Sequence, residues 1–145
     1  MAIVAPTNIR LEKLACNHEP TTFEYLSACV TSLGALCVII VIYRPGSQAV
    51  SSVFFEELTH LLKRLSTLQL VLTDDMNIRL DRPDDPHTLR FNDILTSFRL
   101  SLVQHAQQPT HNLGGISDIV VTKTDSQSPN VSVKDVGLSD HCLVQ

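Results

Sequence analysis

The sequence has no excess of basic residues that could attract nucleic acid over a broad surface. It contains 11 Lys and Arg against 15 Asp and Glu, so the formal net charge is −4 and the isoelectric point is near 5.8. Any contact with phosphate groups must therefore be local, because the whole chain does not present a positive field. A nuclease is not excluded, since a site that binds a hard cation is itself acidic.

The sequence also lacks the cysteine spacing of a zinc site. Its four cysteines form no C-x-x-C pair and no Cys/His set with zinc spacing. We expect the cysteines to be small buried hydrophobic residues of a protein in a reducing compartment. Cys29 and Cys37 flank a short turn and could face each other across a hairpin.

Long apolar segments are absent as well. The start of the chain has no signal-peptide pattern. The longest apolar run, Leu33 to Tyr43, is shorter than the roughly 20 residues that a membrane span needs. The sequence therefore predicts an intracellular protein without a membrane partner.

What is present describes a globular protein. Hydrophobic residues make up 43% of the chain and charged residues 18%. A chain of 145 residues is long enough for one domain with a real core, and it buries roughly 68–70% of its unfolded surface. We expect a single domain over residues 1–145.

Alternating and continuous apolar patterns predict strands separated by turns. The run from Leu33 to Tyr43 is typical of a buried central strand, preceded by a turn at Ser32–Gly34. Together these segments indicate antiparallel strands at the start of the chain. We expect strands at 8–14, 22–31, 33–43, 68–73 and 118–122, with a short strand at the end of the chain.

Two helices are predicted between the strands. The first is capped by Ser51 or Ser52, with Glu56 and Glu57 near its positive end. The second has Asp85 at its cap and Pro86 in its first turn. Each helix carries one apolar stripe: Phe54, Leu58, Leu61, Leu62 and Leu65 in the first, and Phe91, Ile94, Leu95 and Phe98 in the second. The fold class is therefore α/β, with helices between strands.

The strand at 68–73 ends in a run of polar residues that includes Asp75 and Asn77. Residues two apart on an extended backbone point to the same side, so the two side chains would project together if the strand continues as far as Asn77. Loops beyond strand ends are where α/β proteins usually build sites. The alternative is an Asx-type turn without a chemical role.

Two further strand ends carry polar residues. In Ser139–His141, the Asp140 carboxylate can bind a divalent cation while the His141 imidazolium donates to a phosphoryl oxygen, or the segment is only an exposed loop. Asp118 begins the strand at 118–122, where a simple capping role is the alternative. Three such strand ends in one small domain favour a metal-dependent phosphodiesterase site.

These motifs, in this order, resemble the endonuclease/exonuclease/phosphatase superfamily. They are Tyr-x-Pro at Tyr43, Asp-x-Asn at Asp75, Asp118 at a strand start, and Ser-Asp-His ending at His141. More closely, "FEYLSACVTS", "VIYRPGS", "DDPHTLRFNDIL", "QPTHN" and "VGLSDHCLV" resemble the endonuclease domain of LINE-type (non-LTR) retrotransposons, over essentially the whole chain. The resemblance implies an α/β sandwich of two mixed, largely antiparallel sheets flanked by helices, without its first strands.

The resemblance also implies a role for each matched residue. Tyr43 would lie near the scissile phosphate, Asp75 would orient or deprotonate the attacking water, and Asn77 would hold that water or the phosphate.

The remaining matched residues would act on the metal and on charge. Asp140 would contribute to the metal site. His141 would stabilise charge on the phosphoryl oxygens, with Asp118 accepting a hydrogen bond from its other nitrogen. The implied cofactor is Mg²⁺ or Mn²⁺, and phosphodiester hydrolysis needs such an activated water together with charge neutralisation.

The implied function is nicking of one DNA strand by contact with its phosphate backbone. The nick leaves a 3′ hydroxyl that primes a reverse transcriptase of the parent element, and a functional protein would be nuclear. The family carries an asparagine and a metal-binding glutamate on two strands upstream of the matched region. Because this chain begins after them, we expect weakened metal binding and weak or absent cleavage.

Two alternatives to the nuclease remain open. The first is a catalytically inactive binding module or a decayed remnant. The second is a phosphodiesterase acting on inositol phosphates or sphingomyelin, although "DPHTLRF" and "QPTHN" favour the retroelement branch.

Overall fold

The computed structural model describes residues 1–15, 19–32, 35–65, 69–103, 109–111, 116, 118–126, 131–137 and 141–144 of the chain. These described residues form two helices and eight strands. The helices are α1 (Ser52–Leu65) and α2 (Pro86–Ser97). The strands are β1 (Arg10–Lys13), β2 (Glu24–Ser32), β3 (Ala35–Tyr43), β4 (Leu70–Asp75), β5 (Leu100–Leu102), β6 (Asp118–Lys123), β7 (Val133–Lys134) and β8 (Leu143–Val144).

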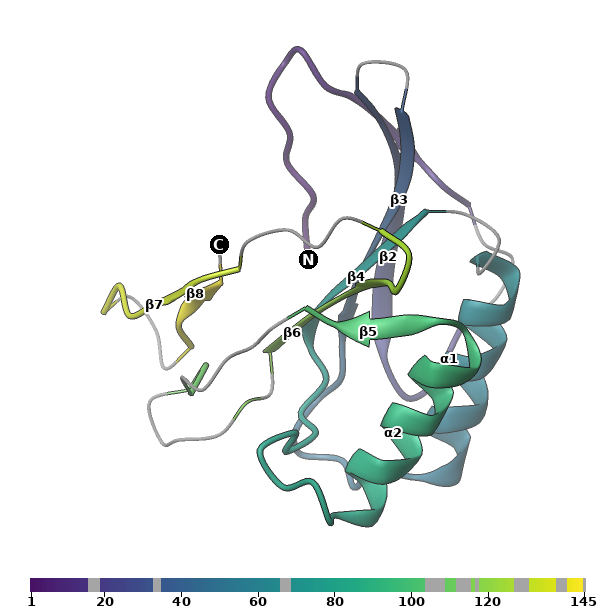
Figure 1. The fold of residues 1–145 in the computed structure, drawn as a ribbon, viewed down its shortest axis with the longest axis vertical. Helices are drawn as coiled ribbons and strands as arrows, with labels where there is room; N and C mark the ends of the chain where they lie inside the picture. The colour runs from purple at the N-terminus through teal and green to yellow at the C-terminus, as the bar shows by residue number, and fades with distance from the viewer. Residues whose placement is uncertain are drawn as a thin grey trace.

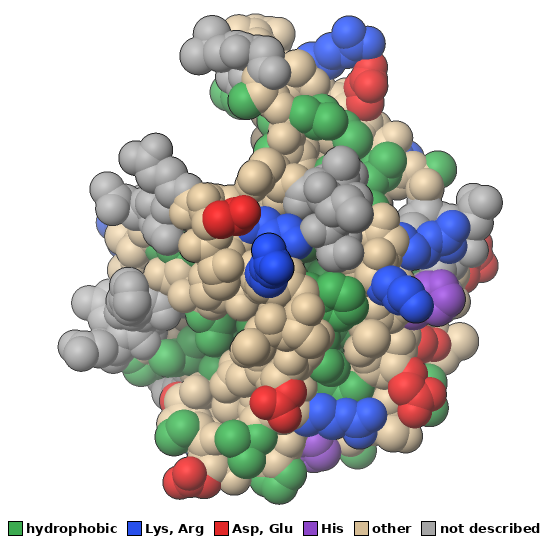
Figure 2. Space-filling model, turned by 45° about the vertical axis from the view of Figure 1, so that its right-hand side comes forward, with side chains coloured by type: hydrophobic (Ala, Val, Ile, Leu, Met, Phe, Trp, Pro, Cys, Tyr) green, Lys and Arg blue, Asp and Glu red, His purple; other side chains and the backbone are tan. Residues whose placement is uncertain are grey.

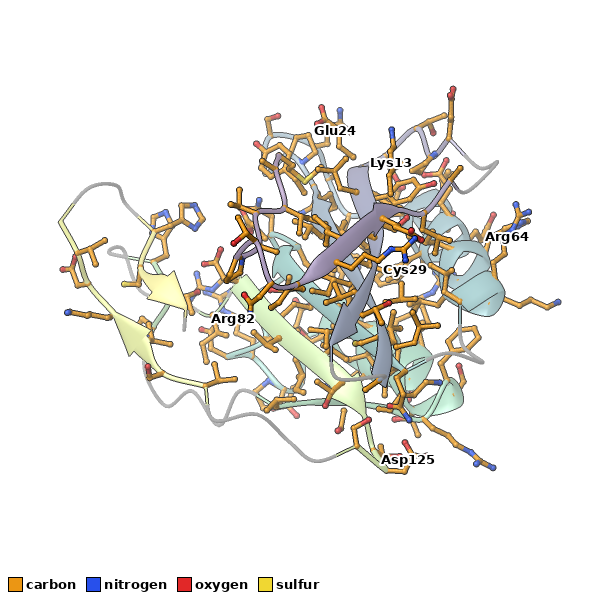
Figure 3. All side chains as sticks on the ribbon, turned by 90° about the horizontal axis from the view of Figure 1, so that it is seen from above. Lys13, Glu24, Cys29, Arg64, Arg82 and Asp125 are labelled. Carbon is orange, nitrogen blue, oxygen red and sulfur yellow. The ribbon has the colours of Figure 1, made fainter. Side chains whose placement is uncertain are left out.

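Six of the strands form one mixed sheet in the order β1-β2-β3-β4-β6-β5. Only β3 and β4 pair in parallel among these neighbours, and α1 connects them as a crossover helix. Both helices cover one side of the sheet, whereas β7 and β8 pair with each other on the other side (Figure 1). The view from above shows the same separation (Figure 3). The predicted α/β class with mixed, largely antiparallel sheets is confirmed.

The hydrophobic core lies between the sheet and the two helices. Alternate residues of β3 are fully buried on the helix side, as the apolar run predicted for a central strand. The core residues include Val38, Ile40 and Ile42 of β3, Leu70 and Leu72 of β4, Phe54, Phe55, Leu58, Leu61, Leu62 and Leu65 of α1, and Phe91 and Leu95 of α2. This packing fixes the neighbouring ends of β3, β4 and β6 next to one another.

The predicted helix starts are confirmed. The Ser51 hydroxyl accepts a hydrogen bond from the Phe54 amide at 3.3 Å, and the Asp85 carboxylate accepts from the His87 amide at 2.9 Å. Pro86 follows at the first position of α2.

Several details of the strands differ from the predictions. The strand expected at 8–14 is shorter, the strand expected at 68–73 runs from Leu70 to Asp75, and β5 and β7 were not predicted. The register pairs Cys29 with Val38 and Cys37 with Val30, so the two cysteines point to opposite faces and do not face each other. Of the turn predicted at Ser32–Gly34, residues 33 and 34 lie outside the described residues. No helix among the described residues is long and apolar enough to cross a membrane.

Candidate active site

Two carboxylates meet where β4 ends and β6 begins. The antiparallel register of these strands places Asp75, the last residue of β4, directly opposite Asp118, the first residue of β6. Residues paired in this way have their side chains on the same face of the sheet. Asp75 is only 6% exposed. The topology therefore brings together two acids that lie 43 positions apart in the sequence numbering, from 75 to 118.

The imidazole of His141 lies between these two carboxylates. Its Nδ1 is 3.1 Å from both carboxylate oxygens of Asp118, and its Nε2 is 3.9 Å from Oδ2 of Asp75. When Nδ1 carries a hydrogen it donates to Asp118, which directs Nε2 toward Asp75. The structure thus places His141 beside Asp118, as the predicted pairing requires.

Thr110 and His111 contact the segments that carry Asp118 and His141. Thr110 is fully buried, its hydroxyl accepts a hydrogen bond from the Asp118 amide at 3.2 Å, and its carbonyl accepts from the Cys142 amide at 2.8 Å. The rings of His111 and His141 contact edge to face with centroids 5.0 Å apart. Sequence reasoning did not assign either residue a role, although the "QPTHN" segment that contains them carried part of the resemblance.

Asp75 and Asn77 are joined by a turn. The Asn77 amide donates to Oδ1 of Asp75 at 2.9 Å, and the Asn77 side-chain Nδ2 donates to Oδ2 of Asp75 at 2.8 Å. The strand ends at Asp75, and Asn77 has a φ of 49°, so the expected extended arrangement as far as Asn77 is wrong. The Asx-type turn, weighed above as the alternative to a site, is itself what brings the two side chains together.

Arg44 is a part of this site that sequence reasoning missed. It is 3% exposed, and its guanidinium donates to the carbonyls of Met76 at 2.7 Å and Asn77 at 2.6 Å. Burial lowers the pKa of Arg44, and the negative charge of Asp75 opposes that shift. A charged residue between an apolar strand and a Pro-Gly turn was the signal that could have found it.

The remaining predicted residues lie at the same edge of the sheet or outside the described residues. The register of β3 on β4 pairs Val41 with Thr73, so Tyr43 comes beside Asp75 and on the same face, where its side chain is 40% exposed. Asp140 lies outside the described residues. The structure thus brings together Asp75, Asn77, Asp118 and His141, with Tyr43 at the same strand end.

These donors fit a divalent cation. Ligand atoms of Asp75, Asp118 and His141 all lie within 4.8 Å of one another. Mg²⁺ is held in proteins through one or two carboxylates together with waters and substrate phosphates, and this cluster supplies two carboxylates. The hydrogen bonds that each carboxylate already accepts leave further lone pairs on its oxygens. A metal centre is therefore compatible with this group.

Comparisons with known proteins agree with this arrangement at the level of the fold. No protein-family model matches the chain, and no curated protein matches it by sequence. The endonuclease domain of TRAS1, a telomere-specific non-LTR retrotransposon, superposes with a TM-score of 0.70 at 11% identity, over 93% of this chain and 76% of that domain.

Two bacterial endonuclease/exonuclease/phosphatase family proteins are also similar. The one from Leptotrichia buccalis has a TM-score of 0.59 at 10% identity, over 97% of this chain and 70% of that one. The one from Bacteroides thetaiotaomicron has a TM-score of 0.50 at 13% identity, over 84% of this chain and 53% of that one. The chain therefore has the endonuclease/exonuclease/phosphatase fold, which confirms the predicted resemblance as far as the fold.

Proposed function

We propose that the chain is a metal-dependent phosphodiester hydrolase that nicks DNA, as the endonuclease domain of a non-LTR retroelement. The observation that carries the proposal is the position of His141 between two carboxylates. Its Nδ1 faces Asp118 and its Nε2 faces Asp75. The similarity in fold to the endonuclease domain of TRAS1 supports the same reaction class.

His141 acts on the phosphate in this proposal. Asp118 holds the Nδ1 hydrogen, so a protonated imidazole donates from Nε2 to a phosphoryl oxygen and stabilises the charge that develops there. Nε2 lies 3.9 Å from Oδ2 of Asp75, so the phosphoryl oxygen bound by His141 would lie next to the water bound by Asp75. Tyr43, exposed beside Asp75, contacts the same phosphate.

Asp75 and Asn77 act on the attacking water. The Asp75 carboxylate accepts a hydrogen bond from the water and takes its proton as the water oxygen bonds to phosphorus. The bond from phosphorus to the 3′ oxygen breaks, and that oxygen takes a proton from solvent to give the 3′ hydroxyl. A reverse transcriptase of the parent element would extend this hydroxyl, which requires a nuclear location.

A divalent cation, Mg²⁺ or Mn²⁺, would supply charge neutralisation at the phosphate. Asp75 and Asp118 would hold it, together with the predicted ligand Asp140. Asp75, Asp118 and Asp140 carry one negative charge more than protonated His141 and Arg44 together, so a cation would be needed to compensate the charge of the substrate phosphate. We expect weak cation binding and slow cleavage, because the oxygens of Asp75 and Asp118 also accept hydrogen bonds from Asn77 and His141.

Nicking of a supercoiled plasmid tests the proposal. We expect slow conversion to the open circle with Mg²⁺ or Mn²⁺, none with a chelator, and a 3′ hydroxyl at each nick. His141→Ala should lower the rate by on the order of 10²-fold or more. His60→Ala, at an exposed position of α1, is the matched control and should retain the wild-type rate.

Three results would argue against the nuclease. Nicking that is insensitive to His141→Ala would mean a contaminating enzyme. DNA binding without cleavage, unchanged by Mg²⁺ and by Asp140→Ala, would favour a binding module. Turnover of an inositol phosphate or of sphingomyelin in the absence of DNA cleavage would favour the other phosphodiesterase branch.

A further inference from the structure

We propose that Arg44 and Gly46 are positioning residues of this active site: they hold the Asn77 carboxamide so that it binds Asp75 and presents its carbonyl oxygen to the attacking water. The inference rests on the proposed function, since it specifies how the water-binding half of that site is built. It also makes a claim about the orientation of one side chain that holds whether or not the chain cleaves DNA.

The guanidinium of Arg44 is surrounded by backbone carbonyls. Nε donates to the Met76 carbonyl at 2.7 Å, and one terminal nitrogen donates to the Asn77 carbonyl at 2.6 Å. The other terminal nitrogen donates to the carbonyls of Gln48 at 2.6 Å and Pro45 at 3.2 Å. Arg44 thus ties the loop after β3 to the loop after β4. Lysine cannot reproduce this, because its three donors radiate from a single atom.

Arg44 and Asn77 bind each other reciprocally. The Arg44 side chain donates to the Asn77 carbonyl, and the Asn77 side chain donates to the Arg44 carbonyl at 2.8 Å. Asn77 has a φ of 49°, a left-handed conformation that asparagine adopts more readily than most other residues. The two hydrogen bonds from Arg44 to consecutive carbonyls, those of Met76 and Asn77, hold this conformation in place.

Gly46 leaves room for the carboxamide. A Cβ atom at position 46 would lie 2.8 Å from Oδ1 of Asn77, which is closer than real Cβ contacts, and 3.1 Å from its Cγ, which is unusually tight. The atoms that would have to move are at the end of the Asn77 side chain, so the strain falls on the hydrogen bonds that its Nδ2 makes to Asp75 and Arg44. Alanine at this position would therefore displace the carboxamide while leaving the fold intact.

Steady-state nicking kinetics test the two residues separately. Gly46→Ala should lower kcat on the order of 10- to 100-fold because the water-binding group is misplaced. The Kd for DNA should stay near wild type, and the melting temperature should fall by at most a few degrees. Ser47→Ala, an exposed neighbour in the same turn, is the matched control and should change neither.

Arg44→Lys should lower kcat in the same way and also reduce stability, because buried carbonyls lose their donor. Arg90→Lys is its control, because it makes the same chemical change on α2. The Arg90 guanidinium lies over the Phe55 ring, 4.7 Å from the ring centroid. If Arg44→Lys fails to fold, Gly46→Ala decides the proposal.

The side-chain amide of Asn77 gives a readout that needs no cleavage. Its Nδ2 donates both to Oδ2 of Asp75 and to the Arg44 carbonyl, so we expect slow exchange of the Asn77 carboxamide protons with water in nitrogen-15 NMR spectra. Gly46→Ala and Arg44→Lys should each speed this exchange several-fold, whereas Ser47→Ala and Arg90→Lys should not.

The two proposals can fail separately. If the wild-type chain does not nick DNA, the proposed function fails and the exchange of the Asn77 carboxamide alone decides the positioning role. Variants at Arg44 and Gly46 that leave both this exchange and kcat unchanged would overturn the positioning role. A fall in kcat that merely follows the melting temperature, with wild-type exchange, would overturn it as well.

Discussion

The orientation of one carboxamide decides which substrate group Asn77 can bind. Its nitrogen donates to Oδ2 of Asp75 and to the Arg44 carbonyl, so Oδ1 is the acceptor that the side chain presents. Phosphate oxygens are acceptors and cannot bond to another acceptor, whereas a water molecule can donate. Of the two roles that the resemblance implied for Asn77, this geometry supports contact with the attacking water.

Asn77→Asp is the change that tests this orientation. The two side chains have the same shape, but aspartate has no donor for Asp75 or for the Arg44 carbonyl and adds a second negative charge next to Asp75. We expect kcat for nicking to fall on the order of 10²-fold, and the free energy of unfolding in urea to fall by about 1–3 kcal/mol.

Asn92→Asp on α2 is the matched control for that substitution, because it makes the same chemical change away from the site. Its nicking rate should equal that of the wild type. An Asn77→Asp variant that nicks as fast as the wild type would show that the carboxamide does not orient the water.

At the scale of the residue, the sequence predicted which side chains lie together, but not the backbone conformation that joins Asp75 to Asn77. Asp75, Asn77, Asp118 and His141 were predicted as polar residues at strand ends. The pairing of β4 with β6 places the two aspartates opposite each other, and His141 lies close to both. The expected cause was an extended strand through Asn77, whereas a turn with φ of 49° does it. For Arg44 the sequence offered only its position between an apolar strand and a Pro-Gly turn, because its carbonyl partners at Met76 and Asn77 come from a distant loop.

At the scale of the element, Glu57 joins α1 to the segment before β2. It was expected near the positive end of α1, yet no acidic residue lies in the first turn of that helix. Its carboxylate accepts from the Thr21 amide and hydroxyl at 2.8 and 2.9 Å, and from the Thr22 amide and hydroxyl at 3.1 and 2.6 Å. Burial raises the pKa of Glu57, but these hydrogen bonds outweigh burial and the pKa lies below its ordinary value of 4.5.

Glu57→Gln should therefore change the pH dependence of stability. A carboxyl whose pKa is lowered by folding stabilises the fold above its unfolded pKa, near 4.5, and loses that contribution as pH falls through the folded pKa. We expect the variant to be less stable than wild type by about 1–2 kcal/mol at pH 7 and to approach wild type as the pH falls through the folded pKa of Glu57, which lies below 4.5.

Urea unfolding between pH 3 and 7 measures this effect. Glu56→Gln is the control, because Glu56 is the exposed neighbour of Glu57 on the same helix. A difference between wild type and Glu57→Gln that stays constant over this pH range would contradict the assigned hydrogen bonds.

The elements that the sequence predicted are those whose own residues carry a pattern. The buried run of β3, the stripe of α1 and the Asp85-Pro86 start of α2 are local signals, and each element appears where it was expected. The three-residue strand β5 has no such pattern. It exists because its residues pair with β6, a contact of tertiary structure that no short window of sequence contains.

At the scale of the whole molecule, the charge distribution makes DNA binding depend on the site. The chain carries a net charge of −4, and on the face drawn in Figure 2 acidic and basic side chains are interspersed without a broad basic patch. With no broad basic patch on that face, few Lys and Arg side chains there can contact phosphates and release counterions. In the proposed function, attraction for the phosphate backbone would therefore come mainly from a cation held by Asp75 and Asp118.

Mg²⁺ and DNA should consequently strengthen each other's binding. We expect Mg²⁺ to lower the Kd for an oligonucleotide with a non-cleavable phosphate linkage by about tenfold or more at constant ionic strength, because a cation held by Asp75 and Asp118 would neutralise the charge of the phosphate. By linkage, DNA must raise the affinity for Mg²⁺ by the same factor. Calorimetric titrations in both orders measure the two factors, and K⁺ at matched ionic strength controls for screening. Equal affinity for DNA in Mg²⁺ and in chelator would show that a cation at this site does not contribute to DNA binding.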